Sequence, residues 1–276
     1  MRNISKHIGL FMILASWAIG LVSCSDEAKN VDDMNSVKVT FTAVIPEETR
    51  AYGDASQVNM LVVAAYTKED DNYIEVERKN VEITNAATAV QFTLVKNQPF
   101  TFVFWAYNSE CDIYDTEDLT AINMTNCGAV TFEQSEKCDA FFAVREVTNS
   151  YDTEFIVELV RPLAQINVGT TGDAVKAGLT VNNAPTTFYP LSNSVGGSAN
   201  YTWEFTNSTT EKLDVDGVEY NYLAVAYLFA SETPQTYSAG ITIANDDETT
   251  TTLELESITL QSNSRCNIVG NITANY

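Results

Sequence analysis

A strict alternation of apolar and polar residues opens the folded part of the chain. The apolar residues of "SVKVTFTAVIP" all fall on one side of an extended backbone: Val37, Val39, Phe41, Ala43 and Ile45. Successive side chains of a strand point to opposite faces, so this period of two predicts a long strand with one buried face. Pro46 has no N–H to donate to a sheet and should end the strand.

Further strands are predicted at short intervals after this one. The segment "VNMLVVAAY" (58–66) is almost entirely apolar and suits a central strand, whereas "NYIEVERKNVEI" (72–83) alternates and suits an outer one. Two more apolar runs, at 88–94 and 100–107, are separated by the turn-forming "VKNQP". A short helix is predicted at 116–124, with Asp115 as its N-cap.

A second set of strands starts with "EFIVELVRPLAQINVGT", residues 154–170, and continues to about residue 273. Pro162 predicts a bulge or a change of strand partner within this segment. Asp216-Gly217 lies between two strand-like runs and predicts a tight hairpin turn. The apolar register slips between Leu255 and Ile258, which predicts another bulge.

Some fifteen short strands and a polar break near 145–153 together predict an all-β fold. We expect two tandem β-sandwich domains of transthyretin-like or Greek-key topology, with at most one or two short helices. The predicted domains cover 36–150 and 151–276. No sequence repeat of fixed period is visible, which argues against a propeller or a solenoid.

The first residues have the properties of an export signal. Arg2 and Lys6 precede an apolar run, and "LVSC" ends at Cys24, so residues 1–23 read as a signal peptide. "LVSC" also resembles the lipobox of bacterial lipoproteins, whose cysteine is acylated, as by palmitate. Residues 24–50 would then be a lipidated tether plus the first strand. "SDE" after Cys24 is similar to the signal that sends Bacteroidetes lipoproteins from the outer membrane to the cell surface.

Charge and histidine content exclude several functions. Without residues 1–23 the chain has 13 basic and 37 acidic residues, so its formal charge is 13 − 37 = −24. Such a surface repels nucleic acid. The only histidine, His7, lies in the signal peptide, so neither a histidine-based catalytic site nor a histidine-ligated zinc can form. No acidic pair stands out as a glycosidase site. We therefore expect no enzyme, no catalytic residues, no cofactor and no metal.

The remaining cysteines are Cys111, Cys127, Cys138 and Cys266. An exported chain permits disulfides, and the sequence suggests that Cys111 pairs with Cys127 or with Cys138. Cys266 can instead be a small buried apolar residue.

Aromatic residues raise the possibility of sugar binding. Trp105 lies inside a strongly apolar strand and is expected in the core. Trp203 follows a Gly- and Ser-rich loop and is the better candidate to stack on a glycan.

Four segments together resemble the fimbrillin family, the type V pilins of Bacteroidetes. "LVSCSDE" is similar to their lipoprotein start, and "FTFVFWAYN" to the aromatic strand of their first domain. "VELVRPLAQINVGT" closely resembles the segment L-x-R-P-x-A-Q-I-x-V-x-T that opens their second domain. "ITLQSNSRCNIVGNIT" resembles their closing strand, N-x-R-T-N-I-x-G-N-L, with Cys266 where Thr is usual. The last two segments are the specific ones.

The resemblance implies a structural subunit of cell-surface fimbriae, or pili, that supports adhesion. In that family an arginine- or lysine-specific protease cuts after the first long strand, which here places the bond between Arg50 and Ala51. The strand then leaves its groove, and a strand of a neighbouring subunit replaces it by donor-strand exchange. The implied partners are other fimbrial subunits, an arginine-specific protease and, before processing, the outer membrane that the lipid on Cys24 enters.

Two alternatives stay open. The protein could be a fimbrial anchor subunit that keeps its lipid, with Arg50 uncut. It could also be a surface lipoprotein that never polymerises and binds a glycan or a host protein.

Overall fold

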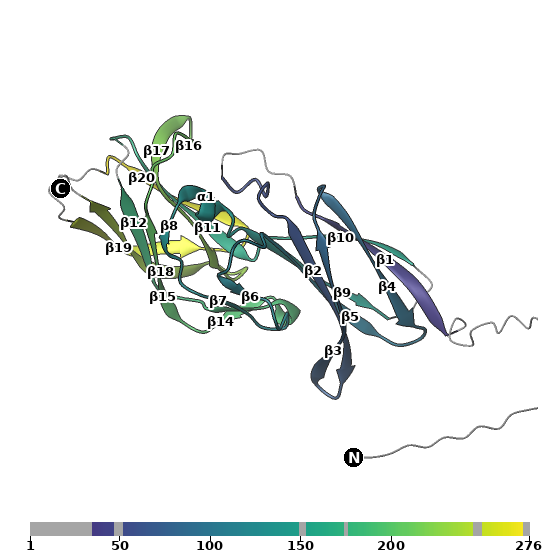
Figure 1. Ribbon diagram of the computed structural model, residues 1–276. Helices are drawn as coiled ribbons and strands as arrows, with labels where there is room; N and C mark the ends of the chain where they lie inside the picture. Colours follow the sequence, from purple (N-terminus) through teal and green to yellow (C-terminus); the bar gives the residue numbers. More distant parts are fainter. Residues whose placement is uncertain (1–34, 47–51, 149–152, 174–175, 245–249, 273–276) are drawn as a thin grey trace, which may run out of the picture. The chain divides into compact units, whose positions relative to one another are not determined.

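The computed structural model describes residues 35–46, 52–148, 153–173, 176–244 and 250–272 (Figure 1). Strands dominate these residues and form five β-sheets within them. Their helical segments are α1, Phe132–Glu136, and the 3-10 turn Pro190–Ser192. The all-β class predicted from the periodicity is therefore confirmed. Among the described residues, no helix is long and apolar enough to cross a membrane.

Two sheets enclose a hydrophobic cluster that we call the first core. One sheet has the order β10-β1-β4 and the other the order β3-β2-β5-β9. Aromatic side chains at the centre of the first core come from both sheets: Phe41, Phe92, Phe102, Phe104 and Phe141. The strands are β1 (Ser36–Val44), β2 (Met60–Glu69), β3 (Asn72–Glu82), β4 (Ala87–Val95), β5 (Phe100–Tyr107), β9 (Ala140–Val147) and β10 (Glu154–Glu158).

The central strands β2 and β5 are buried on both faces of their sheet. Along β2, Leu61 and Val63 face the first core, whereas Val62 and Ala64 face a second hydrophobic cluster, the second core. Neither face meets water, so apolar residues occupy both alternating sets of positions. This explains the unbroken apolar run that predicts a central strand.

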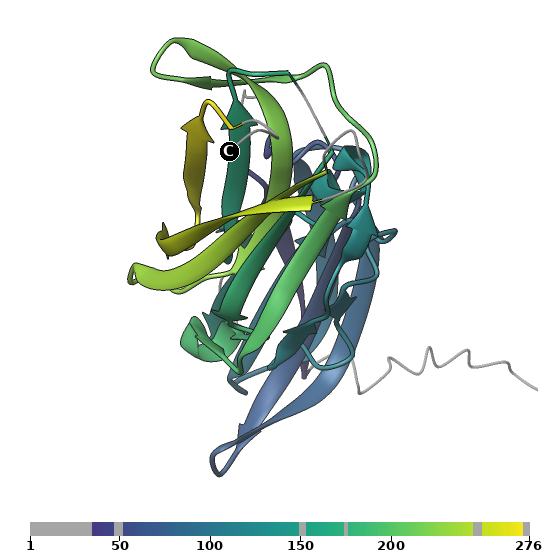
Figure 2. The same cartoon turned by 90° about the vertical axis from the view of Figure 1, so that its left-hand side faces the viewer.

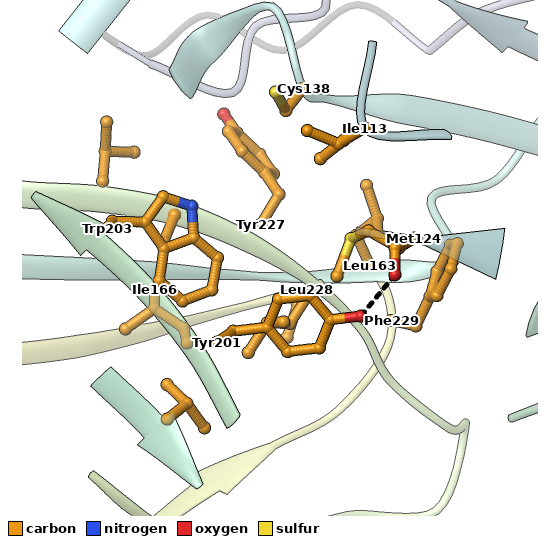
Figure 3. Close-up of a cluster of buried hydrophobic side chains, with 14 of the residues drawn as sticks. Ile113, Met124, Cys138, Leu163, Ile166, Tyr201, Trp203, Tyr227, Leu228 and Phe229 are labelled. Atoms are coloured by element: carbon orange, nitrogen blue, oxygen red, sulfur yellow. Dashed lines mark hydrogen bonds between the residues drawn. The ribbon is translucent and has the colours of Figure 1, made fainter. Parts of the chain in front are cut away.

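Three further sheets surround the second core (Figure 2). Their orders are β16-β17-β11-β20, β19-β18-β12-β15-β8 and β14-β13-β7-β6. Tyr201 and Trp203 stack inside this core, and the Tyr201 hydroxyl donates to the Met124 carbonyl at 2.7 Å (Figure 3). The strands are β6 (Tyr114–Asp115), β7 (Ile122–Met124), β8 (Gly128–Val130), β11 (Leu163–Thr170), β12 (Ala177–Ala184), β13 (Thr187–Tyr189), β14 (Ser194–Gly196), β15 (Ala199–Phe205), β16 (Lys212–Val215), β17 (Val218–Phe229), β18 (Gln235–Ala244), β19 (Thr250–Leu260) and β20 (Ser264–Gly270).

Pro162 marks a change of sheet, as predicted. β10 ends at Glu158 in the sheet of β1, and β11 begins at Leu163 in the sheet of β17 and β20. The two other predicted irregularities are also present. Asp216 and Gly217 form a hairpin turn with φ values of 55° and 82°, and the β18–β19 register shifts between Leu255 and Ile258.

The helix predicted at 116–124 is wrong. Asp115 accepts a hydrogen bond from the Glu117 N–H, and Asp118 accepts one from the Thr120 N–H, so both side chains stabilise turns. The helix lies instead at α1, where Thr131 and Gln134 form a capping box.

Strands on the two sides of residue 150 pair with each other. β7 pairs with β13, β8 pairs with β15, and β1 pairs with β10. Residues Ser36–Tyr276 form one compact unit that contains both cores. The division into domains 36–150 and 151–276 stays a prediction.

Candidate functional site

β1 occupies the middle of its sheet. It pairs antiparallel with β4 along its whole length, from Ser36 opposite Val95 to Val44 opposite Ala87. On its other side it pairs in parallel with β10, where Phe41 lies opposite Phe155. We call the space between β4 and β10 the β1 slot. A chain without β1 would expose unpaired N–H and C=O groups on both sides of this slot.

The buried face of β1 consists of the alternating apolar residues of the sequence pattern. Val39 and Phe41 are completely buried, Ala43 and Ile45 are nearly so, and Val37 is half-buried. These are the residues predicted to fill a groove. The structure places them in the first core, and their replacement by another strand stays a prediction.

Phe41 is the centre of this contact. Its ring centroid lies 4.4 Å from that of Phe102, 5.4 Å from that of Phe104 and 5.4 Å from that of Phe155. Aromatic pairs at such distances contribute about 0.5–1.5 kcal/mol each beyond the burial of their area. Phe41 is therefore the side chain that anchors β1 most strongly.

A second candidate site holds the backbone of Tyr52 and Gly53. Side chains from α1, β11, β20 and the adjoining loops bind this backbone directly or through one another. We call them the Gly53 clamp: Glu136, Asp139, Arg161, Gln165 and Arg265.

Arg161 is the buried centre of the Gly53 clamp, with 2% of its side chain exposed. Its guanidinium donates to both carboxylate oxygens of Asp139, at 2.6 and 2.8 Å. It also donates to the Gly53 carbonyl at 2.9 Å and lies 4.9 Å from the ring centroid of Phe141. The bidentate geometry and the added hydrogen bond compensate two charges that water does not reach.

Glu136 holds the other side of the same peptide. One carboxyl oxygen accepts from the Gly53 N–H at 2.6 Å, and the other accepts from the Tyr227 hydroxyl at 2.8 Å. Burial raises the pKa of Glu136 to about 8, because the loss of hydration outweighs the two hydrogen bonds that favour the charged form. The clamp thus contains a carboxyl group that titrates near neutral pH.

Gln165 and Arg265 are the remaining members of the Gly53 clamp. The Arg265 guanidinium donates to Gln165 Oε1 at 2.9 Å and to the Gly53 carbonyl at 3.3 Å. Gly53 has a φ of +82°, and a Cβ at this position would lie 2.2 Å from Gln165 Oε1. Only glycine fits such a backbone and such a close approach.

The side chain of Tyr52 borders a polar cavity of about 600 Å³. Its hydroxyl donates to Thr209 Oγ1 at 2.9 Å, and its ring packs edge-on against Tyr222 with 5.0 Å between centroids. The lining combines these two aromatic rings with amide and charged side chains, namely those of Asn167, Lys212, Asp214, Asp216, Arg265 and Asn267. The carboxylate groups and the basic groups both come from described strands or their turns.

Three predicted site residues lie outside the described residues: Cys24, Arg50 and Ala51. The roles of Cys24 in lipidation and of Arg50 and Ala51 in processing therefore stay predictions. The nearest described residues after the predicted cleavage bond are Tyr52 and Gly53, which the clamp holds.

The Gly53 clamp was not predicted from the sequence. Arg161 and Gln165 belong to "VRPLAQ", and Arg265 belongs to "SNSRCN", which are the two segments with the specific fimbrillin resemblance. One signal was available, because an arginine between apolar residues needs a buried partner when its strand is buried. Its partner Asp139 and its target Gly53 are 22 and 108 residues away, and no local pattern connects them.

Two expectations about single residues need correction. Trp203 is 1% exposed, so it packs in the second core and cannot stack on a glycan; Trp105 is buried as expected. Cys111, Cys127, Cys138 and Cys266 are all unlinked thiols in this structure, so the suggested disulfide of Cys111 is absent.

The fold is that of an all-β protein of paired sheets. Its first described strand lies in the middle of its sheet. The profile of a family of unknown function, DUF6562, matches residues 30–276, and the chain therefore belongs to that family. No curated protein sequence matches the chain significantly.

Solved structures share this architecture. A candidate adhesin from Bacteroides ovatus aligns with a TM-score of 0.50 and 13% identity, over 81% of this chain and 77% of the other. A candidate adhesin from Bacteroides thetaiotaomicron gives 0.51 and 13%, over 81% and 80%. The fimbrial anchor protein Mfa2 from Porphyromonas gingivalis gives 0.44 and 13%, over 80% and 82%. At these identities, the two candidate adhesins show a common fold.

Proposed function

We propose that the protein is a cell-surface adhesion protein of the fimbrial type, exported as a lipoprotein that carries its lipid on Cys24. An arginine-specific protease cuts between Arg50 and Ala51, β1 leaves the β1 slot, and a strand of a neighbouring subunit takes its place. The resemblance to fimbrillins and the fold shared with candidate adhesins support this proposal.

The observation that carries the proposal is the position of β1. It is the first described strand, yet it lies between β4 and β10 and buries its apolar face in the first core. A strand at the sheet edge would leave one edge when removed, whereas β1 leaves a slot that another strand can fill on both sides. Strand addition would restore the backbone hydrogen bonds and the apolar face together.

The free energy gained by burying β1 explains why an empty β1 slot would bind another strand. Burying the larger apolar side chains of β1 contributes about 6–10 kcal/mol, at ~1.5–3 kcal/mol each. Whole domains have net stabilities of roughly 5–15 kcal/mol. Loss of β1 without replacement would therefore remove most of the stability, and replacement would make assembly practically irreversible.

The Gly53 clamp supports the same proposal from the other side of the cleavage bond. Gly53 is bound through its N–H by Glu136 and through its carbonyl by Arg161. A cut before Ala51 would free the chain that leads to β1, whereas the chain that follows stays fixed to the rest of the protein.

Cleavage is tested with a chain that starts at Ser25, treated with an arginine-specific protease. We expect a new N-terminus at Ala51 and oligomers that withstand unboiled gels. The variant Arg50→Ala should give neither. Arg145→Ala, which removes an exposed arginine of β9, is the matched control and should behave like the wild type. A wild-type chain that is cut at Arg50 and then only unfolds would contradict the proposal.

Strand replacement is tested separately with a synthetic peptide of residues 36–46 added to the cut chain. The peptide should occupy the slot and block oligomer formation. A peptide with Asp in place of Phe41 should not, because it would bring a charge into the first core.

A second candidate function is glycan binding without polymerisation. The cavity beside Tyr52 favours it, since a half-buried aromatic ring among amide, carboxylate and guanidinium groups suits a sugar. A glycan array should then give binding that Asn267→Ala weakens, with no oligomers after protease treatment.

A further inference from the structure

Three cysteines from separate parts of the chain meet at one cavity. Cys111 lies in the loop after β5, Cys127 directly precedes β8, and Cys138 follows α1. All three line a cavity of about 250 Å³. Lys137 lines it too, and its ammonium group pairs with the carboxylate of Glu110.

Cys138 is the cysteine that contacts both of the others. Its thiol contacts those of both Cys111 and Cys127, and its Sγ lies 3.4 Å from the Gln134 carbonyl, to which it donates. The contacts of Cys127 include Cys138 but not Cys111. A first sulfur–sulfur bond within the cluster therefore involves Cys138.

Cys127 is the thiol best placed to react first. It is half-buried, whereas Cys111 and Cys138 are each only 6% exposed. The neighbouring Cys138 thiol and the Trp203 indole lower the pKa of Cys127 despite its burial. The neighbouring Cys111 and Cys127 thiols, together with burial, raise the pKa of Cys138. The thiolate is the nucleophile in disulfide exchange, so Cys127 should attack and Cys138 should resolve.

Metal binding does not explain the cluster. Across the described ranges, no group of three or more His, Cys, Asp or Glu side chains is arranged to hold a metal ion. Three thiols at one cavity can form a sulfur–sulfur bond, and the export proposed above would bring the protein into oxidising conditions.

We propose that Cys127 and Cys138 form a disulfide by exchange with an external disulfide, whereas Cys111 stays a free thiol. The Cys127 thiolate attacks one sulfur of the external disulfide, forms a mixed disulfide and expels one thiolate. Cys138 then loses its proton, attacks the Cys127 sulfur and expels the second thiolate. Two protein thiols are oxidised, one external disulfide is reduced to two thiols, and the protons pass to the expelled thiolates.

The disulfide would link the residue that precedes β8 to the segment that follows α1. Glu136 and Asp139 flank Cys138 in the sequence, so this bond would also restrain one side of the Gly53 clamp. The proposal does not depend on cleavage at Arg50 or on strand exchange.

The test uses the full chain, reduced and then exposed to oxidised glutathione. After quenching with N-ethylmaleimide, the cysteines are mapped by mass spectrometry of a non-reducing digest. We expect a Cys127–Cys138 cross-link, a free Cys111 and an unreacted Cys266. The oxidised protein should also melt several degrees above the reduced protein, because a closed loop restricts the unfolded chain.

Variants assign the order of the steps. Cys138→Ser should trap glutathione on Cys127, and Cys111→Ser should leave the cross-link unchanged. Should Cys138→Ser fail to fold, a time course on the wild type still decides, since a glutathione adduct on Cys127 should precede the cross-link. A first adduct on Cys111 or Cys138, a Cys111–Cys127 cross-link, or three thiols that stay free would overturn the proposal.

Discussion

A residue with a Cβ at position 53 would be strained in two ways. Its positive φ disfavours L side chains, and Gln165 occupies the space that a Cβ would take. The two effects are separable, because Gly217 has the same φ of +82° with nothing within 4 Å of its Cβ position.

We therefore expect Gly53→Ala to destabilise the protein clearly more than Gly217→Ala. The control should cost about 1 kcal/mol from backbone strain, whereas Gly53→Ala should cost about 1–3 kcal/mol more as the clamp is forced apart. Urea unfolding of both variants measures the difference. Equal effects would show that Gln165 moves aside freely.

Glu136 makes stability depend on pH. Its pKa is raised from 4.5 in the free group to about 8, so the folded chain holds the proton more tightly than the unfolded chain. This contribution is fully present below about pH 4.5 and is lost as the pH rises toward 8. The slope that it adds is at most about 1.4 kcal/mol per pH unit.

Glu136→Gln keeps an acceptor for the Gly53 N–H but cannot titrate. We expect its free energy of unfolding to fall less between pH 5 and pH 8 than that of the wild type. Glu133→Gln, on the same helix and exposed, is the control and should keep the wild-type slope. Parallel pH profiles for the wild type and Glu136→Gln would show that Glu136 stays ionised.

Among the strands, β1 depends most on a single side chain, Phe41, for its attachment to the first core. Phe41→Ala removes a buried ring that contacts four others, which should cost about 3–5 kcal/mol. Lys38→Ala, on the exposed side of β1, should change the stability by less than about 0.5 kcal/mol. Thermal unfolding of both variants tests how strongly the first core holds this strand. A similar small effect of both would mean that backbone pairing alone retains β1.

The sequence was informative where a local pattern decides the structure. The period of two in β1 and the unbroken apolar run of β2 follow from whether one or both faces are buried. Pro162 and Asp216-Gly217 restrict the backbone directly. The helix was misplaced because Asp115 is as good in a turn as at an N-cap, whereas Thr131 and Gln134 were the capping pair that the sequence contained.

No local sequence pattern predicts the Gly53 clamp. Arg265 binds a carbonyl that lies 212 residues earlier in the chain, and Tyr227 supports a carboxyl 91 residues away. The local context of Arg161 indicates only that it needs a buried partner, and only the folded sheets bring the members of the clamp together. Trp203 was misjudged for a related reason, since its neighbouring loop is polar while its strand faces the second core.

At the scale of the whole molecule, the sheet β3-β2-β5-β9 contributes to both cores. Damage to the first core should therefore weaken the second. In a chain that starts at Ser25, the tryptophans are Trp105 and Trp203, and both lie in the second core. We expect Phe102→Ala, in the first core, to shift the tryptophan-fluorescence transition and the circular-dichroism transition by the same denaturant concentration.

Separate transitions would instead support two domains that unfold independently. Ser109→Ala, on an exposed loop, serves as the control that should move neither transition.

The parallel pairing of β1 with β10 also has a consequence for the order of folding. Thr40 lies beside Glu154, so the second side of β1 stays open until more than a hundred further residues have been synthesised. Contacts between residues so distant in sequence raise the contact order and slow the final step of folding. During that interval β1 is attached through β4 alone. The arrival of β10, rather than the final stability of the fold, therefore sets when the first sheet closes.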